Sequence, residues 1–161
     1  MILLSDANVL IDLGYVGGLS ILPRISATEV LDVVLQECEH ESQPGLIDEV
    51  RNSGIVVVTS DLTWLEPARA FRTPALSAED TLNLYYAKTH GRILLAGDKP
   101  LRESCQREGI DVRGSIWLVE EAFSRGLLPA TELCRWLHVW PSLGRRFPKI
   151  ELQRLAELLG C

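Results

Sequence analysis

Met1-Ile-Leu-Leu-Ser-Asp-Ala-Asn-Val-Leu-Ile-Asp12 opens the chain and decides its fold. The apolar run from Ile2 to Leu4 is typical of a strand that is covered on both faces. Asp6 follows it, and a helical segment begins beside Asp6 with no loop between. A carboxylate placed there stands at the carboxyl end of a strand, where ligands bind in open α/β sheets. We interpret Asn8 as an amide that orients a ligand or completes the helix start, and Asp12 as a structural residue.

The same context recurs at Ile93-Leu-Leu-Ala-Gly-Asp98. Because parallel strands all end at one edge of a sheet, Asp6 and Asp98 are predicted to be neighbours. Two apposed carboxylates repel each other unless a divalent cation lies between them, and Mg²⁺ or Mn²⁺ prefer oxygen ligands. The alternative for each residue is a simple helix N-cap, a position at which aspartate is favoured.

Two further acids are candidates for the same edge. Asp80 belongs to Ser77-Ala-Glu-Asp80, which is also a good capping box for a helix that begins there. Glu37 continues the apolar stripe of a predicted helix over 30–41 and therefore points away from its solvated face. Glu29 and Glu41 are the competing candidates for the role of Glu37.

Strand and helix patterns alternate along the whole chain. This alternation predicts an α/β fold with a parallel sheet and helices on both faces. The remaining predicted strands are 25–29, 55–59, 92–96 and 110–113. The predicted helices are 7–14, 17–22 (stopped by Pro23), 30–41, 46–52, 61–72, 78–90, 99–108, 115–125, 129–139 and 151–159, with an irregular stretch between Pro141 and Pro148.

Composition limits the class of protein. A chain of 161 residues with 47% hydrophobic residues predicts one folded domain, residues 1–161, and excludes a disordered chain. No apolar run is long enough to span a bilayer, and no signal peptide is recognisable, so we expect a cytoplasmic protein without membrane contact. The net charge of −6 argues against a broad nucleic-acid-coating surface but fits a cluster of carboxylates.

The four cysteines lack the spacing of a zinc site. In a reducing compartment we expect Cys38, Cys105, Cys134 and Cys161 to be free thiols.

Taken in order, these segments make the chain resemble a PIN domain of the VapC toxin type. The similarity extends over most of the length. Its pieces are Ser5-Asp6-Ala-Asn8-Val-Leu-Ile-Asp12, Val33-Val-Leu-Gln-Glu37, Leu76-Ser-Ala-Glu-Asp80 and Leu94-Leu-Ala-Gly-Asp98, followed by Gly114-Ser115. The chain departs from the family pattern in lacking a proline before Glu37, and in carrying Gly97 where some relatives have another acid.

The resemblance implies a five-stranded parallel sheet in the order 3-2-1-4-5, a three-layer α/β/α fold, and a C-terminal helical extension over about 127–161. It also implies a Mg²⁺- or Mn²⁺-dependent ribonuclease with an RNA substrate, a homodimer, and a small antitoxin protein as partner. Asp6, Glu37, Asp80 and Asp98 would be both the catalytic residues and the metal ligands. The ion would lower the pKa of a bound water and stabilise charge on the phosphate.

Other interpretations remain open at this point. A PIN-like module can bind RNA or protein without cutting, and a phosphoacceptor receiver domain also gathers acids at strand ends. A receiver needs an aspartate ending its third strand and a lysine ending its fifth. Here Thr59-Ser-Asp61 follows the third predicted strand and Lys99 follows the fourth, so the match is poor.

Basic residues near the same edge are candidates for phosphate contacts, with solvated charges as the alternative: Arg92, Lys99, Arg102 and Arg113. Ser115 is either a helix cap or a site hydroxyl. His40, His90 and His138 lie outside the motifs and are interpreted as structural or surface residues.

Overall fold

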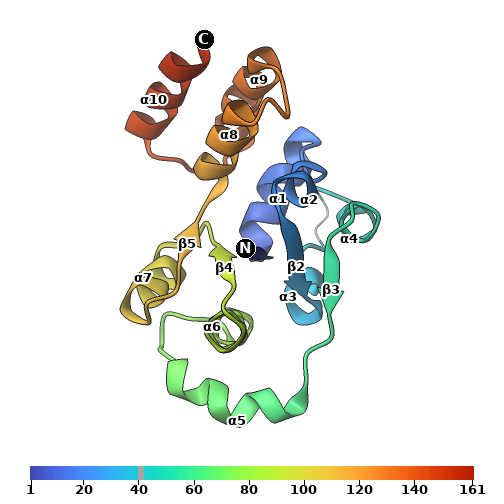
Figure 1. Cartoon of the computed structure of the whole chain (residues 1–161), viewed down its shortest axis with the longest axis vertical. Coiled ribbons are helices and arrows are strands. Elements are labelled where there is room, and N and C mark those ends of the chain that lie inside the picture. Colours follow the sequence, from blue (N-terminus) through green and yellow to red (C-terminus); the bar gives the residue numbers. More distant parts are fainter. Residues whose placement is uncertain (40–41) are drawn as a thin grey trace.

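Five parallel strands form the centre of the molecule (Figure 1). The structure, a computed structural model, describes residues 1–39 and 42–161. The strands are β1 (Ile2–Ser5), β2 (Ala27–Leu31), β3 (Val56–Val58), β4 (Ile93–Leu95) and β5 (Val112–Arg113). Their order, β3-β2-β1-β4-β5, confirms the predicted sheet. It excludes the receiver fold, in which the order is 2-1-3-4-5.

Helices cover both faces of the sheet. One group of helices, α1, α2, α8 and α9, is linked by mutual contacts, and a second consists of α3, α6 and α7, in which α6 contacts the other two (Figure 1). The long helices are α1 (Ala7–Val16), α6 (Ala78–His90), α7 (Lys99–Arg107), α8 (Ser115–Ser124), α9 (Ala130–Ser142) and α10 (Lys149–Leu159). The short ones are α2 (Ile21–Ile25), α3 (Asp32–Gln36), α4 (Leu46–Arg51), the 3₁₀ turn η1 (Leu62–Trp64), α5 (Leu65–Ala68) and the 3₁₀ turn η2 (Arg69–Phe71).

The two central strands are the most deeply buried part of the chain. Leu3 and Leu4 of β1, and Leu94 and Leu95 of β4, are fully buried. This explains why both strands are continuous apolar runs rather than alternating ones. Because β1 and β4 pair in parallel with Ser5 opposite Leu95, the residues that follow them emerge side by side.

The second strand lies later in the chain than the sequence predicted. Val30 and Leu31 continue β2 by pairing with β3, so the helix that follows begins only at Asp32. The prediction that Pro23 ends a helix was also wrong. Pro23 lies in the first turn of α2, where a missing N–H removes no helical hydrogen bond.

The chain ends in a hairpin of two helices. Helix α9 continues through Pro141, one residue from its end, so the predicted irregular stretch shortens to the linker 143–148. Helices α9 and α10 pack on each other, α9 also contacts α1, and α10 contacts α8 (Figure 1).

A disulfide joins Cys134 of α9 to Cys161, with Cα atoms 6.1 Å apart. The prediction of free thiols was therefore wrong for these two residues, because the hairpin brings together cysteines 27 positions apart in the chain. Cys38 and Cys105 are free and buried, as predicted.

Reduction of this disulfide is expected to loosen the hairpin without unfolding the domain. Cross-linking restricts the unfolded chain, which contributes typically about 2 to 4 kcal/mol. We expect a loss near the lower limit, about 2 kcal/mol, because α10 keeps its contacts with α8 and α9. Urea unfolding with and without dithiothreitol measures the difference, and Cys134→Ser should show no further response to the reductant. An equal response of Cys134→Ser would contradict the assignment.

Among the described residues, no helix is long and apolar enough to cross a membrane.

Candidate functional site

The site is built where β1 and β4 end. The backbone N–H of Asp6 donates to the carbonyl of Leu95 at 2.9 Å, extending the pairing of the two strands by one residue. The N–H of Gly97 then donates to the Asp6 carboxylate at 3.0 Å. A Cβ at position 97 would lie 3.2 Å from the Cβ of Asn8, so glycine allows the β4–α7 turn to approach α1 closely. The backbone therefore places Asp6 beside the turn that carries Asp98.

Asp6 is both a helix cap and a buried acid. Its carboxylate accepts hydrogen bonds from the N–H groups of Val9 (2.8 Å) and Gly97, and the residue is 2% exposed. The pKa of Asp6 is raised to about 7, first by burial and to a smaller degree by the negative charges of Asp80 and Asp12, while the two hydrogen bonds lower it. A cap alone does not require such burial. The unfavourable position is what a cation-binding carboxylate would tolerate.

Asp98 and Asp80 lie at the N-termini of two helices at this edge, Asp98 as the cap of α7 and Asp80 in the first turn of α6. Asp98 caps α7 by accepting from the N–H of Leu101 at 3.3 Å, and Ser77 caps α6 by accepting from the N–H of Asp80 at 3.1 Å. Burial, and then the negative charge of Asp98, raise the pKa of Asp80. Asp80 therefore lies within electrostatic reach of both Asp98 and Asp6.

Glu37 lies within electrostatic reach of this cluster, as does Glu79 of α6. Glu37 follows the last residue of the short helix α3, which contacts α6. Partial burial, and then the charges of Glu79 and Asp80, raise the pKa of Glu37 to about 7. The next residue, Cys38, is buried. Burial, and then the negative charges of Glu37 and Asp6, raise the pKa of its thiol to about 12.

Glu29, a competing candidate, has other partners. Its carboxylate accepts from the Nε of Arg92 at 2.6 Å and from the hydroxyl of Tyr86 at 3.0 Å. Arg92 was a candidate for phosphate contacts, but its guanidinium is paired with Glu29. Glu41, the other competitor, and His40 lie outside the described residues.

The chemistry of these donors fits a divalent cation. Among the described residues, none of the four acids Asp6, Glu37, Asp80 and Asp98 forms an ion pair with an arginine, lysine or histidine. Asn83, one turn after Asp80 on the same helix, is fully buried, and neither polar atom of its amide has a hydrogen-bond partner among the described residues. A polar, negatively charged region of this kind suits an ion and its ordered water.

The geometry limits how such an ion would be held. No three His, Cys, Asp or Glu side chains within residues 1–39 and 42–161 lie close enough together to hold one directly. Mg²⁺ commonly binds through one or two carboxylates and keeps several waters. The arrangement fits that mode better than a closed cage of protein ligands.

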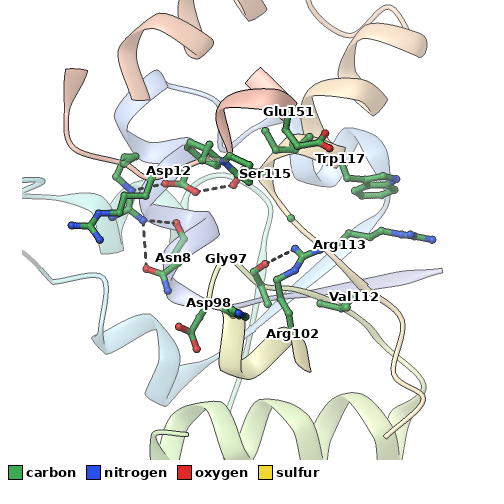
Figure 2. A pocket seen from close by; sticks show the side chains of 18 of the residues that line it. Asn8, Asp12, Gly97, Asp98, Arg102, Val112, Arg113, Ser115, Trp117 and Glu151 are labelled. Carbon is green, nitrogen blue, oxygen red and sulfur yellow. Dashed lines mark hydrogen bonds and ion pairs between the residues drawn. The ribbon is translucent and has the colours of Figure 1, made fainter. Parts of the chain in front are cut away.

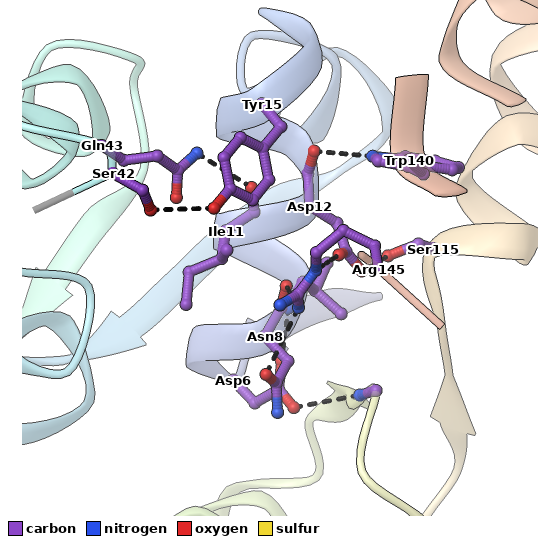
Figure 3. A network of polar contacts seen from close by, with 12 residues as sticks. Asp6, Asn8, Ile11, Asp12, Tyr15, Ser42, Gln43, Ser115, Trp140 and Arg145 are labelled. Atoms are coloured by element: carbon purple, nitrogen blue, oxygen red, sulfur yellow. Dashed lines mark hydrogen bonds and ion pairs between the residues drawn. The ribbon is translucent and has the colours of Figure 1, made fainter. Parts of the chain in front are cut away.

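A second polar network lies next to Asp6 and involves Asp12 (Figure 3). The Asp12 carboxylate accepts from the Nε of Arg145 at 2.6 Å and from the hydroxyl of Ser115 at 2.8 Å. Its carbonyl accepts from the indole of Trp140 at 2.8 Å. Asp12 thus has the structural role that the sequence suggested, since it ties α1 to α8 and to the C-terminal hairpin. Ser115 is the first residue of α8, and Gly114 is its cap.

A pocket of about 920 Å³ adjoins the acids on the α7 and α8 side (Figure 2). Asp98 and Asn8 line its inner end, and Lys99, Arg102 and Arg113 line it as well. The linker 143–148 forms another wall and contributes Arg145 and Arg146. These two arginines could not be identified from the sequence, because no local pattern places a linker between distant helices at the end of β4.

Comparison with known proteins agrees with the fold. A family model, DUF3368, described as a PIN domain, matches residues 2–155. No curated protein matches the chain. A solved structure, a PilT N-terminus domain protein SSO1118 from the archaeon Sulfolobus solfataricus P2, is similar with a TM-score of 0.57 and 13% sequence identity, covering 73% of this chain and 90% of its own. PIN domains are generally nucleases that use divalent metals, and the family match over nearly the whole length shows that the chain belongs to the PIN domain family.

Proposed function

We propose that the protein is a Mg²⁺- or Mn²⁺-dependent endoribonuclease. The observation that carries the proposal is the position of Asp80 within electrostatic reach of Asp6, Glu37 and Asp98 at one sheet edge. Within the described part of the chain, no cationic side chain pairs with any of these four acids. Burial, and to a smaller degree the neighbouring acids, raise the pKa values of Asp6 and Glu37 to about 7, so the ionised carboxyls are unfavourable in the protein alone. A divalent ion would relieve the repulsion and return the carboxyls to their ionised form.

In this proposal the acids hold the ion and the fold positions them. Asp6 has a fixed orientation because two backbone N–H groups hold its carboxylate. Asp98 and Asp80 are oriented by the helix N-termini at which they lie, and Glu37 completes the cluster from the end of α3. When bound, the ion supplies a water of lowered pKa and stabilises negative charge on the phosphate.

The same proposal extends to the biological role, in which the protein is the toxin of a toxin–antitoxin pair and forms a homodimer. Leu62 and Leu65 are the apolar side chains that support a contact with a partner protein. They lie on the segment between β3 and α6, and they are 84% and 52% exposed. Apolar side chains in this position offer contact area to a partner protein.

The direct test is cleavage of structured RNA with Mg²⁺ or Mn²⁺ by wild type, Asp80→Asn and Asp98→Asn. Metal-ion catalysis contributes several kcal/mol, so each substitution should lower the cleavage rate by at least about a hundredfold. Asp48→Asn, an exposed acid of α4, is the matched control and should leave the rate unchanged. Cleavage that survives both site substitutions would refute the site. Failure of the wild type to cleave, with RNA binding retained, would instead make the protein a non-catalytic RNA-binding module.

A further inference from the structure

The pocket between α7, α8 and the linker 143–148 is continuous with the acid cluster, because Asp98 belongs to both. A polynucleotide whose scissile phosphate lay at Asp98 would therefore pass its neighbouring nucleotide into this pocket. Whether the pocket can bind that negatively charged nucleotide depends on the charges of the side chains that line it.

Most acidic side chains of the pocket are already neutralised within the protein. Glu120 and Glu151 both pair with Arg154, and Asp12 pairs with Arg145. The pair between Lys99 and Glu103, at 3.8 Å, is long and exposed. In contrast, neither Arg102 nor Arg146 has a carboxylate partner in the part of the chain that the structure describes. Arg102 and Arg146 thus line the pocket with positive charges that no described carboxylate neutralises.

Arg102 is held in place without being neutralised. Its Nη1 donates to the carbonyl of Ala96 at 3.0 Å, and Figure 2 shows the side chain reaching toward the end of β4. The guanidinium has five N–H donors, so this one bond leaves the others available. Its place depends on Gly114, where a Cβ would lie only 2.7 Å from Nη1. The absence of a side chain at position 114 makes room for the arginine.

Arg146 is positioned by its two neighbours. Arg145 is bound to Asp12, and the ring of Phe147 packs on Trp140 with centroids 4.8 Å apart. With both flanking residues anchored in the protein, the exposed side chain of Arg146 stands at the pocket wall on a short, fixed piece of backbone.

The α8 side of the pocket carries an aromatic ring, that of Trp117, on which a nucleotide base could stack. Trp117 of α8 is half-buried, and the guanidinium of Arg113 lies 5.9 Å from its ring centroid (Figure 2). Aromatic and guanidinium planes are the surfaces on which bases of single-stranded RNA stack.

We propose that this pocket is a subsite for the nucleotide that flanks the scissile bond in single-stranded RNA, with Arg102 and Arg146 binding its phosphate and Trp117 with Arg113 contacting its base. The inference rests on the proposed ribonuclease function and assigns to the C-terminal hairpin a direct share in substrate binding. It also gives a physical role to the Asp12–Arg145 pair, which sets the position of the linker.

The test measures binding of a short fluorescein-labelled single-stranded RNA in EDTA by anisotropy, so that cleavage does not interfere. Arg102→Gln and Arg146→Gln are each expected to raise Kd about tenfold and to reduce the slope of log K against log salt by about 0.7. Arg51→Gln, an exposed arginine of α4, is the matched control and should bind like wild type. Wild-type thermal stability in all variants confirms that they are folded.

Gly114→Ala provides an independent probe that removes no charge. The position has an extended backbone, with φ −139° and ψ −172°, which alanine adopts without strain, so the added methyl acts by displacing Arg102. We expect Gly114→Ala to weaken RNA binding about as much as Arg102→Gln, and the double variant to bind no worse than either single one. Additive effects would show that Arg102 and Gly114 act separately and would overturn this account of Arg102.

Failure of the subsite and failure of the function give different results. Metal-dependent cleavage by wild type, with Arg102→Gln and Arg146→Gln binding RNA as tightly as Arg51→Gln, overturns the subsite alone. Wild-type protein that neither binds nor cleaves RNA overturns the proposed function, and the subsite with it.

Discussion

Asp6→Asn should abolish metal-dependent RNA cleavage, by about a thousandfold or more, while making the metal-free protein less sensitive to pH. The activity is expected to fall because an amide is a poor ligand for a hard cation and Asp6 is the most fixed of the four acids. The loss corresponds to about 4 kcal/mol of transition-state stabilisation. Cleavage of structured RNA with Mn²⁺ measures it, and Asp48→Asn serves as control.

The effect on stability follows from the pKa of Asp6. The folded-state pKa is about 7 and the unfolded value is 3.8, so folding favours the protonated carboxyl. The stability that this protonation provides is complete below about pH 4 and is lost as the pH rises through 7. For a buried group, this difference is on the order of 4 kcal/mol between pH 4 and pH 8 in the absence of metal.

Asparagine does not titrate, so this dependence should disappear from the variant. The variant amide cannot accept from both Val9 and Gly97, and the lost hydrogen bond costs about 1 kcal/mol at every pH. Urea unfolding in EDTA at pH 5 and pH 8 measures both effects. Added Mg²⁺ should stabilise wild type at pH 8 but not Asp6→Asn. An unchanged difference between pH 5 and pH 8 in the variant would contradict the burial argument.

Arg145→Ala should destabilise the protein by about 3 kcal/mol at pH 8, the largest stability loss that we expect from any exposed or half-exposed arginine. Removing one partner of a buried ion pair leaves the other charge buried and unpaired. The Asp12 side chain is 5% exposed and that of Arg145 is 25% exposed, so we place the loss at the lower end of the range for such pairs. Arg146→Ala, the adjacent exposed residue, should cost less than about 0.5 kcal/mol.

The loss should depend on pH with a definite sign. Burial already raises the pKa of Asp12, and Arg145 is the largest influence that lowers it. Without Arg145 the folded-state pKa rises further, so the variant loses stability as the pH increases from about 4 through that value, and the deficit is smaller at pH 5 than at pH 8. Asp12→Asn in the same background should restore part of the stability at pH 8. A deficit that is equal at both pH values would show that Arg145 acts through packing alone.

Local signals were sufficient for much of the fold and for the positions of three of the acids in it. Continuous apolar runs identified β1 and β4, and the acids that follow them stand at the predicted edge because pairing in parallel brings strand ends together. Ser77 and Asp80 form the predicted helix start. The boundary between β2 and α3 was not predictable, because Val30 and Leu31 suit a strand or a helix equally. Their pairing with β3 places them in the strand.

The sequence by itself determined which segments become strands, where helices begin, and which carboxylates follow the central strands, because these depend on neighbours a few residues apart. Only the tertiary structure decided that Glu29 forms an ion pair with Arg92 and that Cys134 forms a disulfide with Cys161. It also placed Arg145 and Arg146 in the pocket that Asp98 lines. It also decided the raised pKa of Asp6, because burial is produced by packing of distant segments. Pairings across long chain separations leave no periodic trace in the sequence, whereas a strand that ends in an aspartate does.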